Sequence, residues 1–108
     1  MIYVDFLSTE NGLLTGCRIA GHAEYDEIGS DIVCAAVSSA AYMTINTITD
    51  VMGVSLLSLR IDDEGELFFR LELKDEFRCR EIITGFKIHL TNLEEQYPDN
   101  IQVNYLEV

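Results

Sequence analysis

Residues 31–52, DIVCAAVSSAAYMTINTITDVM, contain neither glycine nor proline, and Gly53 follows them directly. Apolar residues recur in this stretch at three- and four-residue spacing, which places them on one face of a helix. They are Val33, Val37, Ala40, Ala41, Ile45 and Ile48. A glycine directly after a periodic stretch is a typical helix stop. The sequence therefore predicts a helix over residues 31–52 with one apolar face.

Shorter alternating stretches on both sides of this helix indicate strands. Apolar and polar residues alternate near the N-terminus, and Asn11-Gly12 is a hairpin turn signal. The predicted strands are 2–7, 13–23, 55–61, 66–73 and 101–106, and a second helix is predicted over 75–97. The order is β-β-α-β-β-α-β. Because each helix has one apolar stripe, the expected fold is a single α+β domain over residues 1–108: a two-layer sandwich with two helices packed on one face of a mostly antiparallel sheet.

The charge of the chain narrows its possible partners. The 108 residues carry 19 acidic and seven basic side chains, for a net charge of −12. Contacts to phosphate need clustered lysine and arginine, so the sequence predicts no direct binding to nucleic acid or to an anionic membrane. The same charge suits a basic protein or peptide, attracted over long range, and it also suits simple solubility.

Cysteine usage indicates a reducing compartment. The three cysteines Cys17, Cys34 and Cys79 are an odd number without a C-x-x-C pair, which predicts free thiols in the cytoplasm. The first residues, MIYVDFLS, resemble neither a signal peptide nor a membrane anchor. Cys17 and Cys79 fall in apolar patterns and are expected to be buried. No short-range ligand pair is present, so no metal and no cofactor are predicted.

The segment 21–38, GHAEYDEIGSDIVCAAVS, contains residues that packing of a core alone does not explain. It predicts a strand ending near His22, an acidic loop, and a helix that carries Cys34 in its first turn. A helix N-terminus favours a thiolate, and an imidazole nearby can accept the thiol proton and later protonate a leaving amine. This arrangement predicts a Cys34–His22 pair, although a buried structural cysteine is the commoner fate on chemistry alone.

Two neighbours of this pair have more than one interpretation. Asp31 is either the N-cap of the helix or an acid that orients His22, as the third member of a triad does. Ser38 lies one helical turn after Cys34 and either hydrogen-bonds near the site or is a small residue where helix meets sheet.

The joined motif resembles the signature of the ribosomal-processing cysteine protease family: Gly21-His22-Ala23, a variable loop ending at Gly29, and then Asp31-Ile32-Val33-Cys34-Ala35-Ala36-Val37-Ser38. The chain length and the predicted order of elements agree with that family from end to end. The family is known for removing a short N-terminal extension from a large-subunit ribosomal protein.

The resemblance implies an endopeptidase that supports ribosome assembly, with Cys34 as nucleophile and His22 as general base. Gly21 and Gly29 match motif glycines that would permit a tight strand exit and a moving loop over residues 24–30, and Asp31 and Ser38 match further motif positions. The implied substrate is the N-terminal segment of a basic ribosomal protein, and the implied assembly is a homodimer. Two alternatives stay open: a non-catalytic ribosome-associated module that binds a basic protein, and a thiol-based redox or acyl-transfer protein.

Overall fold

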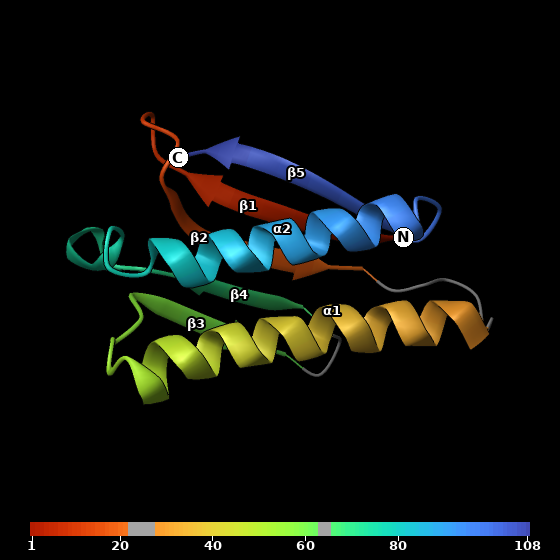
Figure 1. Cartoon of the computed structure of the whole chain (residues 1–108), viewed down its shortest axis with the longest axis horizontal. Helices are drawn as coiled ribbons and strands as arrows, with labels where there is room; N and C mark the ends of the chain where they lie inside the picture. Colours follow the sequence, from red (N-terminus) through yellow and green to blue (C-terminus); the bar gives the residue numbers. More distant parts are fainter. Residues whose placement is uncertain (22–27, 63–65) are drawn as a thin grey trace.

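Five strands and two long helices follow one another in the order that the sequence predicts (Figure 1). The computed structural model describes residues 1–21, 28–62 and 66–108, and of residues 28–31 the backbone only. The elements are β1 Ile2–Ser8, β2 Leu14–Ala20, α1 Ile28–Asn46, the π-helical turn η1 Thr47–Val51, β3 Ser58–Ile61, β4 Leu67–Arg70, the short 3₁₀ helix η2 Leu73–Asp75, α2 Arg80–Gln96 and β5 Ile101–Glu107.

The strands form one mixed sheet in the order β3-β4-β2-β1-β5. β1 pairs with β2, β2 with β4, and β4 with β3, all antiparallel. β5 lies parallel to β1, with Val103 opposite Val4. This one parallel pair arises because α2 carries the chain back along the sheet before β5 begins. The prediction of a mostly antiparallel sheet is confirmed.

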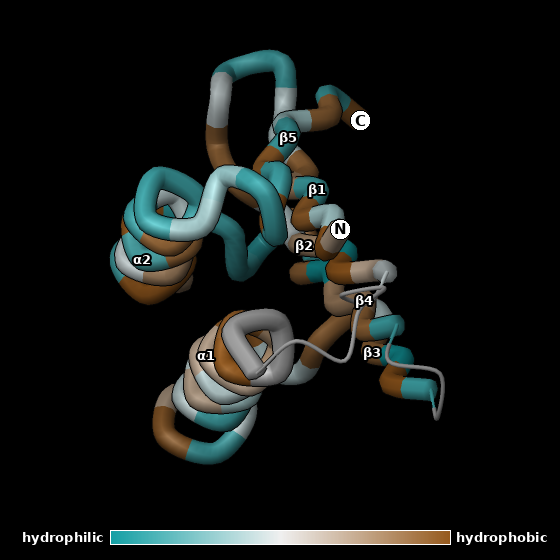
Figure 2. The backbone as a smooth tube through the Cα atoms, turned by 90° about the vertical axis from the view of Figure 1, so that its right-hand side faces the viewer, coloured by the Kyte–Doolittle hydropathy of each residue, from teal (hydrophilic) through white to brown (hydrophobic). Residues whose placement is uncertain are grey.

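Both helices cover the same face of this sheet, as Figure 2 shows end-on. β1 alternates as predicted, with Ile2, Val4 and Phe6 buried beneath the helices. The Phe86 ring of α2 meets the Phe6 ring edge-on, with 5.6 Å between ring centroids, and its centroid lies 6.4 Å from that of Phe69 in β4. The core is therefore one layer of apolar side chains between two helices and a sheet, and the predicted α+β two-layer sandwich is confirmed.

The first helix has the predicted apolar face and the predicted end. Val33, Val37 and Ala41 are fully or almost fully buried against the sheet. At the C-terminal end the helix widens into η1, where the Met52 N–H bonds the Thr47 carbonyl at 2.9 Å, and Gly53 then leaves the helix with φ +69°. The N-terminal end differs from the prediction, because the helix begins at Ile28 rather than near residue 31.

The stretch Ile32–Val51 is long and apolar enough to cross a membrane by length and composition alone. Core helices of globular proteins pass the same test, since they too present an apolar face over several turns. In this protein that face lies on the sheet, where Val37, Ala41 and Ile48 are buried. The core thus accounts for part of the apolar character of the stretch, whereas Ile32, Met43 and Val51 are exposed.

The second helix begins later than predicted. Residues 73–75 form a separate 3₁₀ turn, and α2 starts only at Arg80. The Arg80 guanidinium lies over the Phe77 ring, 3.8 Å from its centroid, and donates a hydrogen bond of 2.9 Å to the Phe77 carbonyl. The Phe77 carbonyl also accepts a bond of 3.3 Å from the Arg80 backbone N–H, which is the three-residue spacing of a turn and not the four-residue spacing of an α-helix.

Gly21 marks a tight exit from β2. It has φ +91°, and a Cβ atom at this position would overlap the carbonyl oxygen of Met1. Only glycine fits such a left-handed position beside another backbone at low cost. The expectation that Gly21 permits a tight strand exit is confirmed.

We predict that Gly21→Ala lowers the free energy of unfolding by at least about 1 kcal/mol, because a left-handed backbone disfavours any Cβ. Gly85→Ala is the matched control: it lies inside α2, its added Cβ meets nothing within 4 Å, and it should raise stability by up to about 1 kcal/mol. Urea unfolding followed by circular dichroism measures both. Equal effects of the same sign would contradict this account of Gly21.

Candidate functional site

Cys34 lies on α1, six residues after the first helical residue, Ile28. This position is in the second turn, so the prediction that Cys34 sits in the first turn is wrong. The unpaired N–H groups of a helix belong to its first four residues, here 28–31, and the effect of the helix dipole falls off within the same turn. Any activation of Cys34 must therefore come chiefly from side chains around it.

The three cysteines differ in their access to solvent. Cys17 and Cys79 are fully buried, as predicted, whereas Cys34 is half-buried and packs against the edge of the core. Burial raises the pKa of the Cys17 thiol, and the negative charge of Asp5 raises it further. Burial and then Asp75 raise the pKa of Cys79, while Arg78 opposes them. Both buried thiols are held in the protonated, unreactive form, which leaves Cys34 as the candidate nucleophile.

The helical spacing places Cys34 on the flank of α1 that faces away from α2. Successive residues are rotated by about 100° in a helix. Taking buried Val37 as the centre of the sheet-facing side, Ala40 lies about 60° to one side and Cys34 about 60° to the other. Ala40 lines the gap between α1 and α2, so the Cys34 flank is the opposite one. In the sheet order this flank lies toward the β3 edge.

Ser38 shares the Cys34 flank, one turn further along α1. Its side chain is exposed, so the interpretation of Ser38 as a small residue where helix meets sheet is wrong. The alternative, a hydrogen bond near the site, stays a hypothesis, because Ser38 has a free hydroxyl among the described residues and lies within one turn of Cys34.

His22 and the following residues 23–27 lie outside the described residues. The structure does place the two ends that flank them. Gly21 closes β2, Ile28 opens α1, and both lie at the same end of the molecule (Figure 1). A chain that leaves β2 at Gly21 therefore enters α1 about one and two-thirds turns before Cys34.

Asp31 and Gly29 both belong to α1. Asp31 is the fourth residue of the helix rather than the residue before it, so the N-cap interpretation is wrong. The role of an acid that orients His22 stays a hypothesis. Gly29 is the second helical residue, so the expectation that it belongs to a loop is wrong, and only residues 24–27 of the predicted moving loop can lie before the helix.

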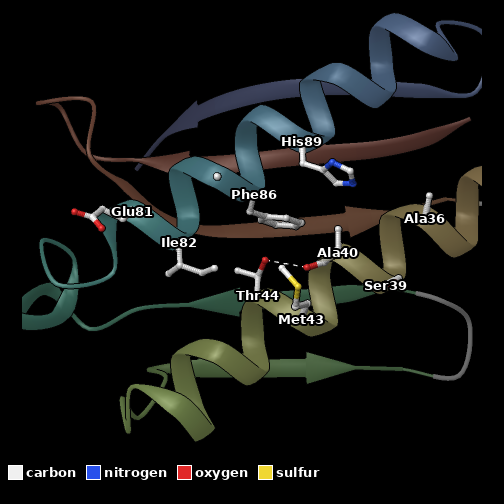
Figure 3. A pocket seen from close by; sticks show the side chains of 10 residues that line it. Ala36, Ser39, Ala40, Met43, Thr44, Glu81, Ile82, Phe86 and His89 are labelled. Carbon is white, nitrogen blue, oxygen red and sulfur yellow. Dashed lines mark hydrogen bonds between the residues drawn. The ribbon is translucent and has the colours of Figure 1, made fainter.

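A groove lies between α1 and α2 (Figure 3). It has a volume of about 600 Å³ and a mostly apolar lining, with Met43 and Ala40 on one wall and Ile82 and Phe86 on the other. His89 borders it. Cys34 is not part of this lining. The sequence analysis missed the groove, although its signal was present: small residues Ala36, Ala40 and Gly85 stand where the helices face each other.

The described residues contain no cluster of three or more histidine, cysteine, aspartate or glutamate side chains that could hold a metal ion. The chemistry that these residues offer is thus that of one accessible thiol. It lies on a helix flank beside an uncovered sheet edge.

Comparison with known proteins agrees with this arrangement. Residues 1–102 match the family described as cysteine protease Prp. The ribosomal processing cysteine protease Prp of Staphylococcus aureus is 31% identical over 106 residues, which cover 97% of this chain and 99% of that protein.

Solved structures show the same fold. The essential ribosomal processing protease Prp from S. aureus, in complex with a substrate peptide, superposes with a TM-score of 0.87 at 29% identity and covers 98% of this chain and 100% of that one. The same protease with a covalently linked product peptide gives a TM-score of 0.86 at 30% identity, with the same coverage. The chain belongs to the Prp family of ribosomal processing cysteine proteases.

Proposed function

We propose that this protein is an endopeptidase with Cys34 as nucleophile and His22 as general base. The observation that carries the assignment is the exposure of the thiols: Cys34 alone of the three cysteines is not fully buried. The S. aureus relative with a covalently linked product peptide supports covalent chemistry in this family. The alternative of a non-catalytic module is equally compatible with the acidic charge, but it gives no role to the accessible thiol of Cys34.

The proposed reaction proceeds through a thioester. His22 takes the thiol proton, the Cys34 Sγ attacks the scissile carbonyl carbon, and the C–N bond breaks as the imidazolium returns the proton to the leaving amine. Water then attacks the thioester, with His22 again as base, and releases the acid and the free thiol. Because Cys34 lies beyond the first turn of α1, His22 supplies the activation that the helix end does not.

Asp31 is proposed as the acid that orients His22. It lies one turn before Cys34 on the same helix, and an acid so near a thiol would oppose thiolate formation unless it faced the imidazole instead. Ser38 is proposed as a hydrogen-bonding neighbour of the substrate on the same flank.

The proposed substrate is the N-terminal extension of a large-subunit ribosomal protein, whose removal supports ribosome assembly. The names of the relatives state ribosomal processing. Ribosomal proteins are basic as a class because they bind RNA. A net charge of −12 favours their approach through long-range attraction. The three free cysteines favour the cytoplasm as the place of action.

The protein is further proposed to form a homodimer through the groove between α1 and α2. The groove is apolar, and Met43 in its lining is 63% exposed. Exposed apolar surfaces often mark interaction sites. Since Cys34 lies on the other flank of α1, a partner in the groove would leave the thiol open to substrate.

Iodoacetamide should modify folded protein at Cys34 only, because the thiols of Cys17 and Cys79 are buried and protonated. Intact-mass measurement should find a single adduct on the wild-type protein and none on Cys34→Ala over the same time. All three cysteines should react in denaturant. Labelling of Cys17 or Cys79 ahead of Cys34 would refute the assignment.

Cys34→Ala should abolish cleavage of the extended ribosomal protein, measured as loss of mass from the substrate. His22→Ala should lower kcat by about 10²- to 10⁴-fold, the usual effect of removing a general base. Cys17→Ala and Cys79→Ala are the controls and should retain turnover, with some loss of stability from the cavities they leave. Activity of the Cys34→Ala protein would end the proposal.

Met43→Asp should convert the dimer to a monomer in sedimentation equilibrium, because it places a charge in an apolar contact. Leu73→Asp is the matched control: Leu73 is 79% exposed and lies outside the groove, and its substitution should leave the mass unchanged. A monomeric wild-type protein, or a dimer that survives Met43→Asp, would contradict the proposed interface.

A further inference from the structure

The two free edges of the sheet are protected to different degrees. At the β5 edge, Glu94 from the last turn of α2 accepts a hydrogen bond of 2.6 Å from the Val103 N–H. A carboxylate in this place blocks the addition of another strand, which is a common way of protecting a sheet edge. The β3 edge has no such device among the described residues.

The register shows which backbone groups of β3 are free. The Leu71 N–H donates a hydrogen bond to the Thr15 carbonyl of the neighbouring chain segment at β2. Because backbone groups alternate in direction along a strand, the odd-numbered residues of β4 bond to β2 and its even-numbered residues bond to β3. The hydrogen bond of 3.0 Å from the Asp62 N–H to the Glu66 carbonyl agrees with this. The backbone groups of Leu59 and Ile61 therefore point away from β4, and within the described residues they have no partner.

The side chains of the same two residues form an uncovered apolar strip. Leu59 lies opposite Phe69 and Ile61 opposite Leu67, so both project to the face of the sheet that the helices cover. Unlike their buried partners, Leu59 and Ile61 are 45% and 48% exposed. The strip therefore lies between the β3 edge and the flank of α1 that carries Cys34.

β3 also points toward the end of the molecule at which α1 begins (Figures 1 and 3). A strand added along β3 would continue past Ile61 toward the first turns of α1, where Cys34 lies. A peptide on this edge is thus carried toward the thiol as an extended chain.

The charges at this end suit a basic peptide. The connection from β3 to β4 contains Asp62, Asp63 and Glu64 in sequence. Glu66, which follows them, is already paired with Arg18 of β2 at 3.1 Å. Arg60, the nearest cation on β3, projects to the opposite face of the sheet, where its guanidinium lies 5.7 Å from the centroid of the Phe68 ring. No arginine or lysine of the described β3 or β4 residues projects to the side of the strip.

We propose that the β3 edge binds the substrate as an added β-strand and delivers it to Cys34. The inference rests on the proposed function and names the substrate class: an extended, basic peptide with apolar side chains at alternate positions. Main-chain hydrogen bonds to Leu59 and Ile61 supply affinity, and the apolar strip selects the alternate side chains, as in other cases of strand addition.

A scan of N-methylated substrate peptides tests the proposal directly. Each peptide carries one methylated backbone nitrogen, and its dissociation constant is measured by fluorescence anisotropy on the Cys34→Ala protein. Methylation should weaken binding at least about tenfold at every second position and little at the positions between, because only alternate N–H groups of an added strand face β3. An effect without this period of two would overturn strand addition.

Measuring binding on the Cys34→Ala protein separates the two proposals. If the unmodified peptide binds with the alternating pattern but wild-type protein does not cleave it, the proposed catalysis fails and strand addition stands. If wild-type protein cleaves the peptide but binding lacks the alternating pattern, strand addition fails and the proposed catalysis stands.

Ile61→Pro is the matching protein variant. It removes one outward N–H and leaves the bonds to β4 in place, and proline is tolerated on the free side of an edge strand. It should raise the dissociation constant at least about tenfold, whereas Ile61→Thr, which keeps the N–H, should raise it less. Equal peptide binding by Ile61→Pro and wild type would refute the proposal. A lower mass of Ile61→Pro than of wild type in sedimentation equilibrium would also refute the proposal. It would show that the β3 edge binds a second copy of the chain.

Discussion

The contact of Phe86 with Phe6 and Phe69 is the interaction on which the rest of the structure depends. It joins α2 to β1 and, across the central strand β2, to β4, with ring centroids 5.6 and 6.4 Å apart. Removal of a buried phenylalanine side chain costs about 3–5 kcal/mol in typical cores. With α2 held over β1 and its neighbours, α1 is left to cover the other half of the sheet. Its two flanks then differ, one facing α2 and the other facing the β3 edge.

This asymmetry of α1 separates the possible binding surfaces of a small protein. The flank toward α2 forms an apolar groove, and the flank away from it carries Cys34 and Ser38 beside the strip of Leu59 and Ile61. A chain of 108 residues has no second lobe to hold a substrate. A sheet edge offers an alternative, because its unpaired backbone groups can bind an extended peptide without a deep cavity.

The three cysteines show how one fold can separate structural and reactive thiols. Cys17 faces inward from β2 and Cys79 lies before α2, and burial raises the pKa of both. Cys34 lies about 60° from the centre of the buried face of its helix, which keeps it in contact with the core while solvent can still reach it. This difference in position explains why only one of the three cysteines is a candidate nucleophile.

Much of the fold followed from local patterns. The alternation of Ile2, Val4 and Phe6 and the helical spacing of Val33, Val37 and Ala41 state which face of each element is buried, because burial of apolar surface dominates folding. The motif of Gly21, His22 and Cys34 identified the family in advance of any coordinates. The ends of the helices could not be predicted equally well. α2 starts only at Arg80, whose guanidinium stacks on Phe77, and α1 starts three residues before Asp31, so that Asp31 lies inside the helix and not at its cap.

By itself, then, the sequence determined the order of the elements, their buried faces and the residues of the motif, since each of these is encoded in the spacing of neighbours along the chain. Only the tertiary structure decided that Cys34 faces the β3 edge, that Glu94 covers the β5 edge through Val103, and that Leu59 and Ile61 stay half exposed. These features join residues far apart in sequence, and they depend on strand order and register. Nothing in the local spacing of the chain specifies either of those.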